Sequence, residues 1–156
     1  MDKKVQQIKQ ILGEAGIEVV IKKFPESTRT AQEAASVIGC TLGQIAKSLV
    51  FKGKDLGKPI LIIASGSNGV DEKKINEFLN EEINKADADF VYQQTGFAIG
   101  GVPPFGHKTA LTTFIDQDLL QYNEIWAAAG TGSSVFRITP KALIEITKGK
   151  ALDLKS

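Results

Sequence analysis

Residues 44–64 read QIAKSLVFKGKDLGKPILIIA, a stretch in which two apolar runs flank a short turn bounded by glycines. The runs Ile45–Phe51 and Pro59–Ala64 predict two core strands, and Gly53 to Gly57 supply the residues of a turn. The pattern is typical of a β-hairpin. Its connection is too short for a parallel crossover, so the two strands should be antiparallel.

Helical and extended patterns alternate on both sides of this hairpin, with no linker and no internal repeat. The spacing of apolar and turn residues predicts five helices, at residues 5–15, 30–39, 71–79, 87–95 and 140–146. With the hairpin, four further extended segments make six strands, the others lying at residues 18–22, 109–115, 124–129 and 135–138. The last two are also joined too closely for a crossover. We therefore predict one mixed α/β domain over residues 1–156, a curved mixed β-sheet or open barrel surrounded by helices.

The second predicted helix carries clear start and stop signals. Thr30 and Glu33 have the spacing of a capping box, in which the Thr30 hydroxyl accepts from the Glu33 amide and the Glu33 carboxylate reaches back. Gly39 ends the helix, and Cys40 follows it directly. Because the C-terminal end of a helix is negative, it should raise the pKa of the Cys40 thiol, which makes this residue a poor nucleophile.

The composition argues against several classes of protein. A formal net charge of +1 does not suit a protein that coats nucleic acid, although four lysines between residues 47 and 58 are either a local basic face or ordinary solvated positions. The sequence has no apolar signal region and no stretch long enough to span a membrane, so we expect a cytoplasmic protein. With one cysteine and one histidine, a disulfide or a zinc site within the chain is not expected, and neither is a cofactor.

Lys47 is the one lysine whose position in the pattern is unusual. It shares a strand face with the apolar residues Ile45, Leu49 and Phe51, so it should point toward the apolar side. An inward lysine needs an anion. From the pattern alone, it could bind a ligand, extend past the strand edge, or pair with a buried carboxylate.

The loop GGVPPFGH at residues 100–107 is the most informative candidate site. Its three glycines let the backbone approach a ligand closely, and its two prolines fix their own φ angles. With Gly96, Gly130 and Gly132, it predicts a pocket formed largely of main-chain amides and carbonyls. His107 has two interpretations, a group at the mouth of this pocket or a surface histidine without catalytic duty.

Other catalytic patterns are weak. The serines near residues 65 and 133 lack the Gly-x-Ser-x-Gly elbow, and no pair of carboxylates suggests acid–base catalysis. The segment Gly66–Gly69 could present amides to an anion, but it lacks the Walker lysine and is better explained as a strand-to-helix turn.

Four motifs, in this order, resemble the YbaK/ProX family, the free-standing relatives of the editing domain of bacterial prolyl-tRNA synthetase. They are TAQEAA at residues 30–35, QIAKSLVF at 44–51, GGVPPFG at 100–106 and AAGTGSS at 128–134. The resemblance implies a mixed sheet curved into a barrel and an aminoacyl-tRNA deacylase, which hydrolyses the ester between a wrong amino acid and the terminal adenosine of tRNA. It implies the acceptor end of mischarged tRNA as partner, with an aminoacyl-tRNA synthetase as a second candidate, and it leaves monomer and homodimer open.

The resemblance also assigns candidate site residues. Lys47 would contact the 3′-terminal nucleotide and Gly101 lies in the substrate loop, which makes these two the candidate catalytic positions. The candidate substrate-binding residues are Thr30, Gly100, Val102, Pro103, Pro104, Gly106, His107, Gly130, Gly132, Ser133 and Ser134. In the family the substrate's own 2′-hydroxyl is thought to help activate water, which would explain why no side-chain base is evident here. The alternative is a non-catalytic module that binds aminoacyl-tRNA or docks on a synthetase.

Overall fold

The computed structural model describes residues 2–25 and 30–156. Within these residues, eight strands form one sheet in the order β1-β7-β6-β2-β3-β5-β8, and β4 pairs with β2 outside that path. The strands are β1 (Ile21–Lys23), β2 (Ile45–Gly53), β3 (Pro59–Ser65), β4 (Ile83–Lys85), β5 (Thr112–Asp116), β6 (Ile125–Ala128), β7 (Ser134–Ile138) and β8 (Lys150–Leu152). The helices are α1 (Lys3–Glu14), α2 (Ala31–Ile38), α3 (Glu72–Leu79), α4 (Ala88–Thr95) and α5 (Pro140–Thr147), with short 3₁₀ turns η1 (Leu42–Gln44) and η2 (Gln117–Gln121).

The predicted hairpin is the centre of the sheet. β2 and β3 pair antiparallel from Ala46 opposite Ser65 to Lys52 opposite Pro59. β6 and β7 are also antiparallel, as their short connection predicts. The pairs β2–β6, β3–β5 and β5–β8 are parallel. The prediction of a mixed sheet is therefore confirmed.

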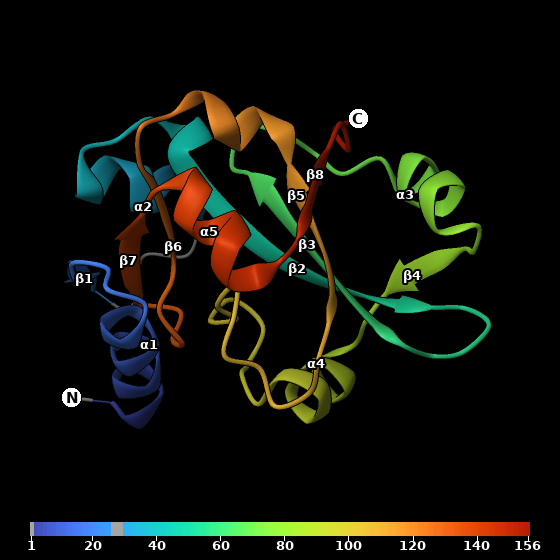
Figure 1. Ribbon diagram of the computed structural model, residues 1–156, viewed down its shortest axis with the longest axis horizontal. Helices are drawn as coiled ribbons and strands as arrows, with labels where there is room; N and C mark the ends of the chain where they lie inside the picture. The colour runs from blue at the N-terminus through green and yellow to red at the C-terminus, as the bar shows by residue number, and fades with distance from the viewer. Residues whose placement is uncertain (1, 26–29) are drawn as a thin grey trace.

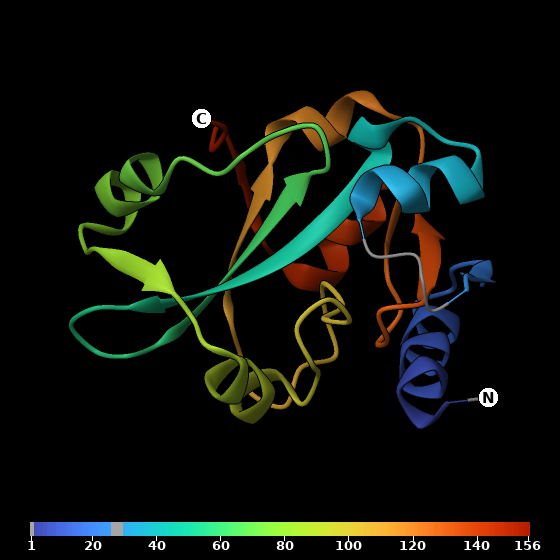
Figure 2. The ribbon, with the colours of Figure 1, turned by 180° about the vertical axis from the view of Figure 1, so that it is seen from behind.

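Helices cover both faces of this sheet. Figure 1 shows α5 in front of the strands, and Figure 2, seen from behind, shows α2 on the opposite side. Leu61 and Ile63 of β3 share a buried cluster with Leu143 of α5, while Ile60 and Ile62 share another with Ile75 of α3. Alternating residues of one strand thus enter two separate parts of the core.

The predicted helices are all present, but two strands are missing from the prediction. β4 and β8 have three residues each and, unlike β1, lie in no run of β-branched residues. The first strand is also shorter than predicted, beginning at Ile21 rather than residue 18. Within the described residues, no helix is both long and apolar enough to cross a membrane.

The start of α2 follows the sequence signal, with one difference. The Thr30 hydroxyl accepts from the Glu33 amide at 3.0 Å, and Gly39 ends the helix in the left-handed conformation at φ 84°. The Glu33 carboxylate, however, accepts from the Thr30 hydroxyl itself, at 3.1 Å. Thr30 is therefore held at the helix start by two contacts.

One edge of β2 is left open in its middle. On that side, pairing with β6 stops at Ala46 opposite Ala127, and pairing with β4 starts at Phe51 opposite Lys85. In the part of the chain that the structure describes, residues 47–50 therefore have no strand beside them there. This gap in the sheet positions the candidate site.

Candidate active site

A cavity of ≈ 580 Å³ lies along the open edge of β2. Its other walls come from α2, from the start of α4, from the loop before Val102 and from the β6–β7 connection. Six of the predicted site residues line it: Thr30, Lys47, Gly100, Val102, Gly132 and Ser134. Motifs far apart in the sequence thus meet at one cavity.

The chemistry of the lining is mainly apolar. Its apolar members include Phe24, Ala34, Trp126, Ala128 and Val135. Lys47 and Lys85 supply the charge, and among the described residues the lining has no carboxylate and no imidazole. Among the described residues, no side chain of the lining can therefore act as a general base at neutral pH unless the pKa of a lysine is strongly lowered.

The open strand edge turns main-chain groups toward the cavity. The Ile45 carbonyl accepts from Gly66 on the β3 side, at 2.7 Å, while the Val50 carbonyl accepts from Ala86 on the other side, at 3.4 Å. Since successive residues of a strand direct their main-chain groups to alternate sides, Ser48 directs its N–H and C=O to the open side. The Ser48 hydroxyl is buried and has no hydrogen-bond partner in the described residues.

Lys47 stands on the face of β2 that the period-two pattern predicts. Its side chain is half-buried, and its ammonium donates to the main-chain oxygen of Asn68 at 3.0 Å. Burial lowers the pKa of Lys47, and the negative charge of Asp116 partly opposes this effect. The contact uses one of three N–H donors of the ammonium, so the inward position of Lys47 is compatible with binding a ligand as well.

Gly101 does not line the cavity but joins two of its walls. A Cβ at this position would lie 2.9 Å from the Cα and carbonyl carbon of Thr131 and 3.1 Å from the amide nitrogen of Gly132. Its neighbour Gly100 has a φ of 90°, which a side chain rarely tolerates, and open space around it. Gly100 therefore supplies the turn and Gly101 the close approach.

Several predicted substrate-binding residues lie outside the lining. Pro103 and Pro104 are buried. Gly106 packs against Ile11 of α1, and Gly130, with φ 101°, packs against the backbone of Lys4. The Ser133 carbonyl accepts from the Phe24 amide at 2.7 Å. These residues shape the loops that form the wall, and the structure places none of them in the lining itself.

His107 lies outside the cavity lining as well. Its Nε2 donates to the Pro103 carbonyl at 2.6 Å, and its ring lies edge-on to Phe97 with 6.4 Å between centroids. Burial lowers the pKa of His107, although the contact with Pro103 raises it. Neither the pocket-mouth nor the free-surface interpretation describes this residue, because the imidazole is half-buried and closes the proline loop.

Two further predictions concern cysteine and metals. The pKa of the Cys40 thiol is raised as predicted, but burial is the largest cause rather than the helix end. Among residues 2–25 and 30–156, no group of three or more His, Cys, Asp or Glu side chains is placed to hold a metal ion.

Ser48 and Asn68 are not among the residues that the sequence predicts for the site. Ser48 lies in the motif QIAKSLVF and Asn68 in the segment Gly66–Gly69, but the sequence singles out neither residue, because the open edge of β2 and the contact of Asn68 with Lys47 depend on pairing between distant segments. Only the adjacent Lys47 indicates that this strand has a special role.

Comparison with known proteins agrees with the geometry. Residues 25–146 match the model of the aminoacyl-tRNA editing domain. The chain is 35% identical over 130 residues to the uncharacterized protein YwhH of Bacillus subtilis, covering 83% of this chain and 82% of that protein. It is 33% identical over 102 residues to a proline–tRNA ligase of Limosilactobacillus fermentum, covering 63% of this chain but 18% of the ligase.

A solved structure covers the whole chain. The crystal structure of "a putative trans-editing enzyme for prolyl tRNA synthetase" has a TM-score of 0.93 and 41% sequence identity, and the match covers 100% of this chain and 99% of that one. With the family match over most of the chain, this shows that the protein belongs to the family of aminoacyl-tRNA editing domains.

Proposed function

We propose that this chain is a trans-acting aminoacyl-tRNA deacylase, which hydrolyses the ester bond of a mischarged tRNA. The observation that carries the proposal is the cavity itself, in which a lysine ammonium and an open strand edge meet and the described lining holds no side-chain base. A relative from Enterococcus faecalis, 26% identical over 132 residues, carries the name "Putative Cys-tRNA(Pro)/Cys-tRNA(Cys) deacylase EbsC", which supports the reaction class.

Lys47 has the position and charge to bind the end of the tRNA. Its ammonium is half-buried, where a charge-assisted hydrogen bond to a phosphate or ribose oxygen is stronger than in open water. The apolar walls of the cavity around Lys47 would hold both the terminal base and the amino-acid side chain. The side chains of Ala34, Ala128 and Val135 in this wall are small and uncharged, so an amino acid with an uncharged side chain fits the cavity best.

Main-chain groups supply the hydrogen bonds to the aminoacyl ester. The Ser48 N–H at the open edge is suited to hold the ester carbonyl oxygen as negative charge develops on it, and one such donor contributes about 10²–10³ in rate. The Ser48 and Gly100 carbonyls are suited to accept from the α-ammonium group of the aminoacyl moiety. Both residues line the cavity, so these carbonyls and the Ser48 N–H would position the ester before the reaction.

The substrate completes the chemistry. Water attacks the ester carbonyl carbon and passes a proton to the ribose 2′-hydroxyl, which relays a proton to the departing 3′-oxygen. The carbon–oxygen ester bond then breaks, giving the free amino acid and a tRNA with both terminal hydroxyls restored. No side chain of the protein gains or loses a proton in this scheme, in keeping with the lining.

A set of mischarged tRNAs tests the proposal. Release of free amino acid should be catalytic for at least one mischarged tRNA, and correctly charged tRNA should be spared. Lys47→Ala should lower kcat/KM by about 10- to 100-fold, as expected when a hydrogen bond to a charged group is lost. The control is Lys54→Ala, which removes an exposed lysine paired with Glu82 at the hairpin turn, far along β2 from Lys47.

The outcomes separate the alternatives. Binding of aminoacyl-tRNA without release of amino acid by the wild-type protein would contradict the proposal and favour a binding module. Release that begins only when a synthetase is added would identify a synthetase as an obligatory partner. Equal activity of Lys47→Ala and Lys54→Ala would remove Lys47 from the mechanism.

A further inference from the structure

The turn between β3 and α3 holds the lysine of the cavity in place. Asn68 lies in this turn, and its main-chain oxygen accepts from the Lys47 ammonium at 3.0 Å. The Asn68 amide nitrogen in turn donates to the Ser65 carbonyl at 3.0 Å, which closes the turn. The position of the Asn68 carbonyl therefore decides where the end of the Lys47 side chain lies.

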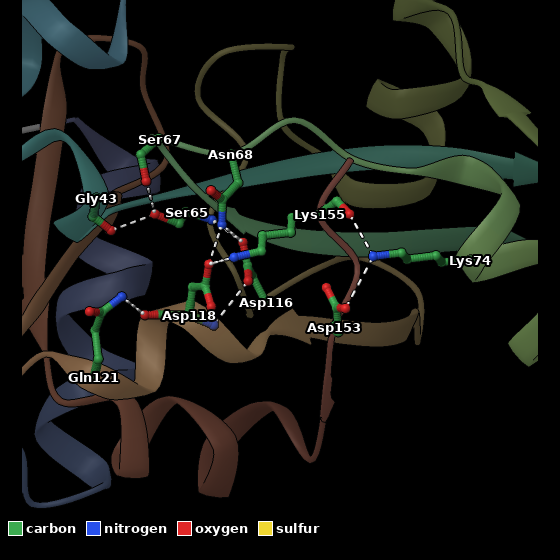
Figure 3. A network of polar contacts seen from close by, with 10 residues as sticks. All are labelled: Gly43, Ser65, Ser67, Asn68, Lys74, Asp116, Asp118, Gln121, Asp153 and Lys155. Atoms are coloured by element: carbon green, nitrogen blue, oxygen red, sulfur yellow. Dashed lines mark hydrogen bonds and ion pairs between the residues drawn. The ribbon is translucent and has the colours of Figure 1, made fainter.

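The side chain of Asn68 is fixed by two carboxylates, as Figure 3 shows. Its Nδ2 donates to Asp116 and to Asp118, each at 2.9 Å. A primary amide has two N–H donors, so both are used. Asp116 is itself fully buried and accepts from the main-chain amides of Ser65 and Asp118, at 3.1 and 3.0 Å. The bridge between the carboxylates thus leaves Asn68 one orientation.

The C-terminal segment completes the arrangement from outside. Lys155 donates to Asp118 at 3.1 Å, through the same Oδ2 that accepts from Asn68. The Ser156 amide donates to the Gly69 carbonyl at 3.2 Å, and the Asp71 amide to the Leu154 carbonyl at 2.8 Å. The turn that carries Asn68 is therefore held by hydrogen bonds to the C-terminal segment as well as to Asp116 and Asp118.

We propose that Asn68 is a positioning residue, which holds the Lys47 ammonium at the cavity wall while Asp116, Asp118 and Lys155 hold Asn68. A lysine side chain has many rotamers, and fixing its end in advance removes that entropic cost from substrate binding. The consequence for deacylation rests on the proposed function, whereas the positioning of Lys47 does not. None of these four residues lines the cavity, so they act through Lys47.

The first test reads Lys47 directly, without tRNA. The protein is labelled with ¹³C-lysine and studied by nuclear magnetic resonance. The signals of the methylene group beside the Lys47 ammonium should be resolved from those of the other lysines in the wild-type protein and averaged by motion in Asn68→Ala. Freed into solvent, Lys47 should also titrate closer to its ordinary pKa of 10.5. Among the charged groups of this region, Asp116 of β5 acts on the Lys47 ammonium, Asp118 of η2 accepts from Asn68 and from Lys155, and Lys85 shares the cavity lining. Unchanged Lys47 signals in a folded Asn68→Ala protein would overturn the proposal.

The second test is a double-mutant cycle on deacylation. Asn68→Ala should lower kcat/KM by at least 5-fold in the wild-type background, on the order of one lost interaction, and should have almost no effect in the Lys47→Ala background. A purely structural role would reduce both backgrounds equally and would contradict the proposal. If neither background releases amino acid, the proposed function fails, and the nuclear magnetic resonance test still decides the positioning.

A matched pair of exposed ion pairs tests the outer part of the arrangement. The Lys155–Asp118 and Lys54–Glu82 pairs have the same N–O distance, 3.1 Å, but only the first touches a partner of Asn68. Lys155→Ala should therefore broaden or shift the Lys47 signals, and Lys54→Ala should leave them unchanged. Identical spectra for the two variants would show that Lys155 has no part in holding Lys47. Thermal unfolding of each variant verifies that it is folded.

Discussion

Replacing Gly101 with alanine tests whether the two glycine-containing loops must touch. The added Cβ would lie 2.9 Å from the Cα and carbonyl carbon of Thr131, whereas carbon atoms in ordinary contact lie about 3.5–4.0 Å apart. Both partners are main chain, so no side chain can turn away to make room. The two loops must therefore separate, by roughly 0.6–1.1 Å if one of them moves as a unit.

That displacement sets the expected magnitude. Thr131 and Gly132 line the cavity, so the movement reaches the wall directly. A misplacement of about 1 Å can cost about 10²-fold in rate, and overpacking costs about 1–3 kcal/mol of stability. We therefore expect Gly101→Ala to lower kcat/KM about 100-fold while the free energy of unfolding falls by only about 1–3 kcal/mol.

Two other glycines provide matched controls. Gly100 has φ 90° with nothing near its missing Cβ, so Gly100→Ala introduces backbone strain without a clash. Gly13 lies in α1 with open space around it, and Gly13→Ala should stabilise the protein by about 0.5–1 kcal/mol without affecting turnover. Single-turnover deacylation and thermal unfolding of all three variants would separate contact from strain. Wild-type turnover and stability in Gly101→Ala would show that the two loops do not need this close contact.

Three further substitutions have distinct expected results. Because burial lowers the pKa of His107, the unfolded chain takes up a proton first as the pH falls through 6.5, so acid destabilises the wild-type protein. The variant His107→Gln should therefore lose less stability than the wild type between about pH 7.5 and pH 5.5. An equally large loss in the variant would contradict this. Thr30→Ala should cost about 1 kcal/mol through loss of the helix cap, whereas Thr30→Ser should keep it, as chemical denaturation can show. Ser48→Ala removes a buried hydroxyl that has no hydrogen-bond partner among the described residues, so stability should stay equal or rise by up to about 1 kcal/mol, and turnover should stay within a few-fold because the proposed donor is the main-chain N–H. A large loss of turnover would assign the hydroxyl a role instead.

The central hairpin and the start of α2 could be predicted because their signals are local. Pro59–Ala64 is a continuous apolar run directly after a turn bounded by glycines, and the Thr30 cap needs only the Glu33 amide three residues away. β4 and β8 could not be predicted, because the pairing of these three-residue segments depends on the strands beside them and not on a pattern in their own sequence. Tertiary pairing decides such short strands.

Six of the thirteen predicted site residues line the cavity, and the sequence could not show which residues would line it and which would lie outside the lining. The sequence pattern placed Lys47 on the apolar face of its strand, but its contact with Asn68, 21 residues away, depends on how a turn folds back. Gly101 carries the contact between loops because Thr131 approaches it, and His107 turns inward because the Pro103 carbonyl is within reach. Loop-to-loop contacts of this kind leave no periodic signal in a sequence.

The most direct test of the account is a comparison of two substrates that differ by one hydroxyl. A tRNA ending in adenosine and a tRNA ending in 2′-deoxyadenosine are each charged at the 3′-oxygen with an amino acid that the protein releases, and single-turnover rates are measured at saturating protein. Since the described cavity lining holds no carboxylate and no imidazole, the 2′-deoxy substrate should bind with similar affinity but react far more slowly. Equal single-turnover rates would show that a group of the protein activates the water, and would contradict the account.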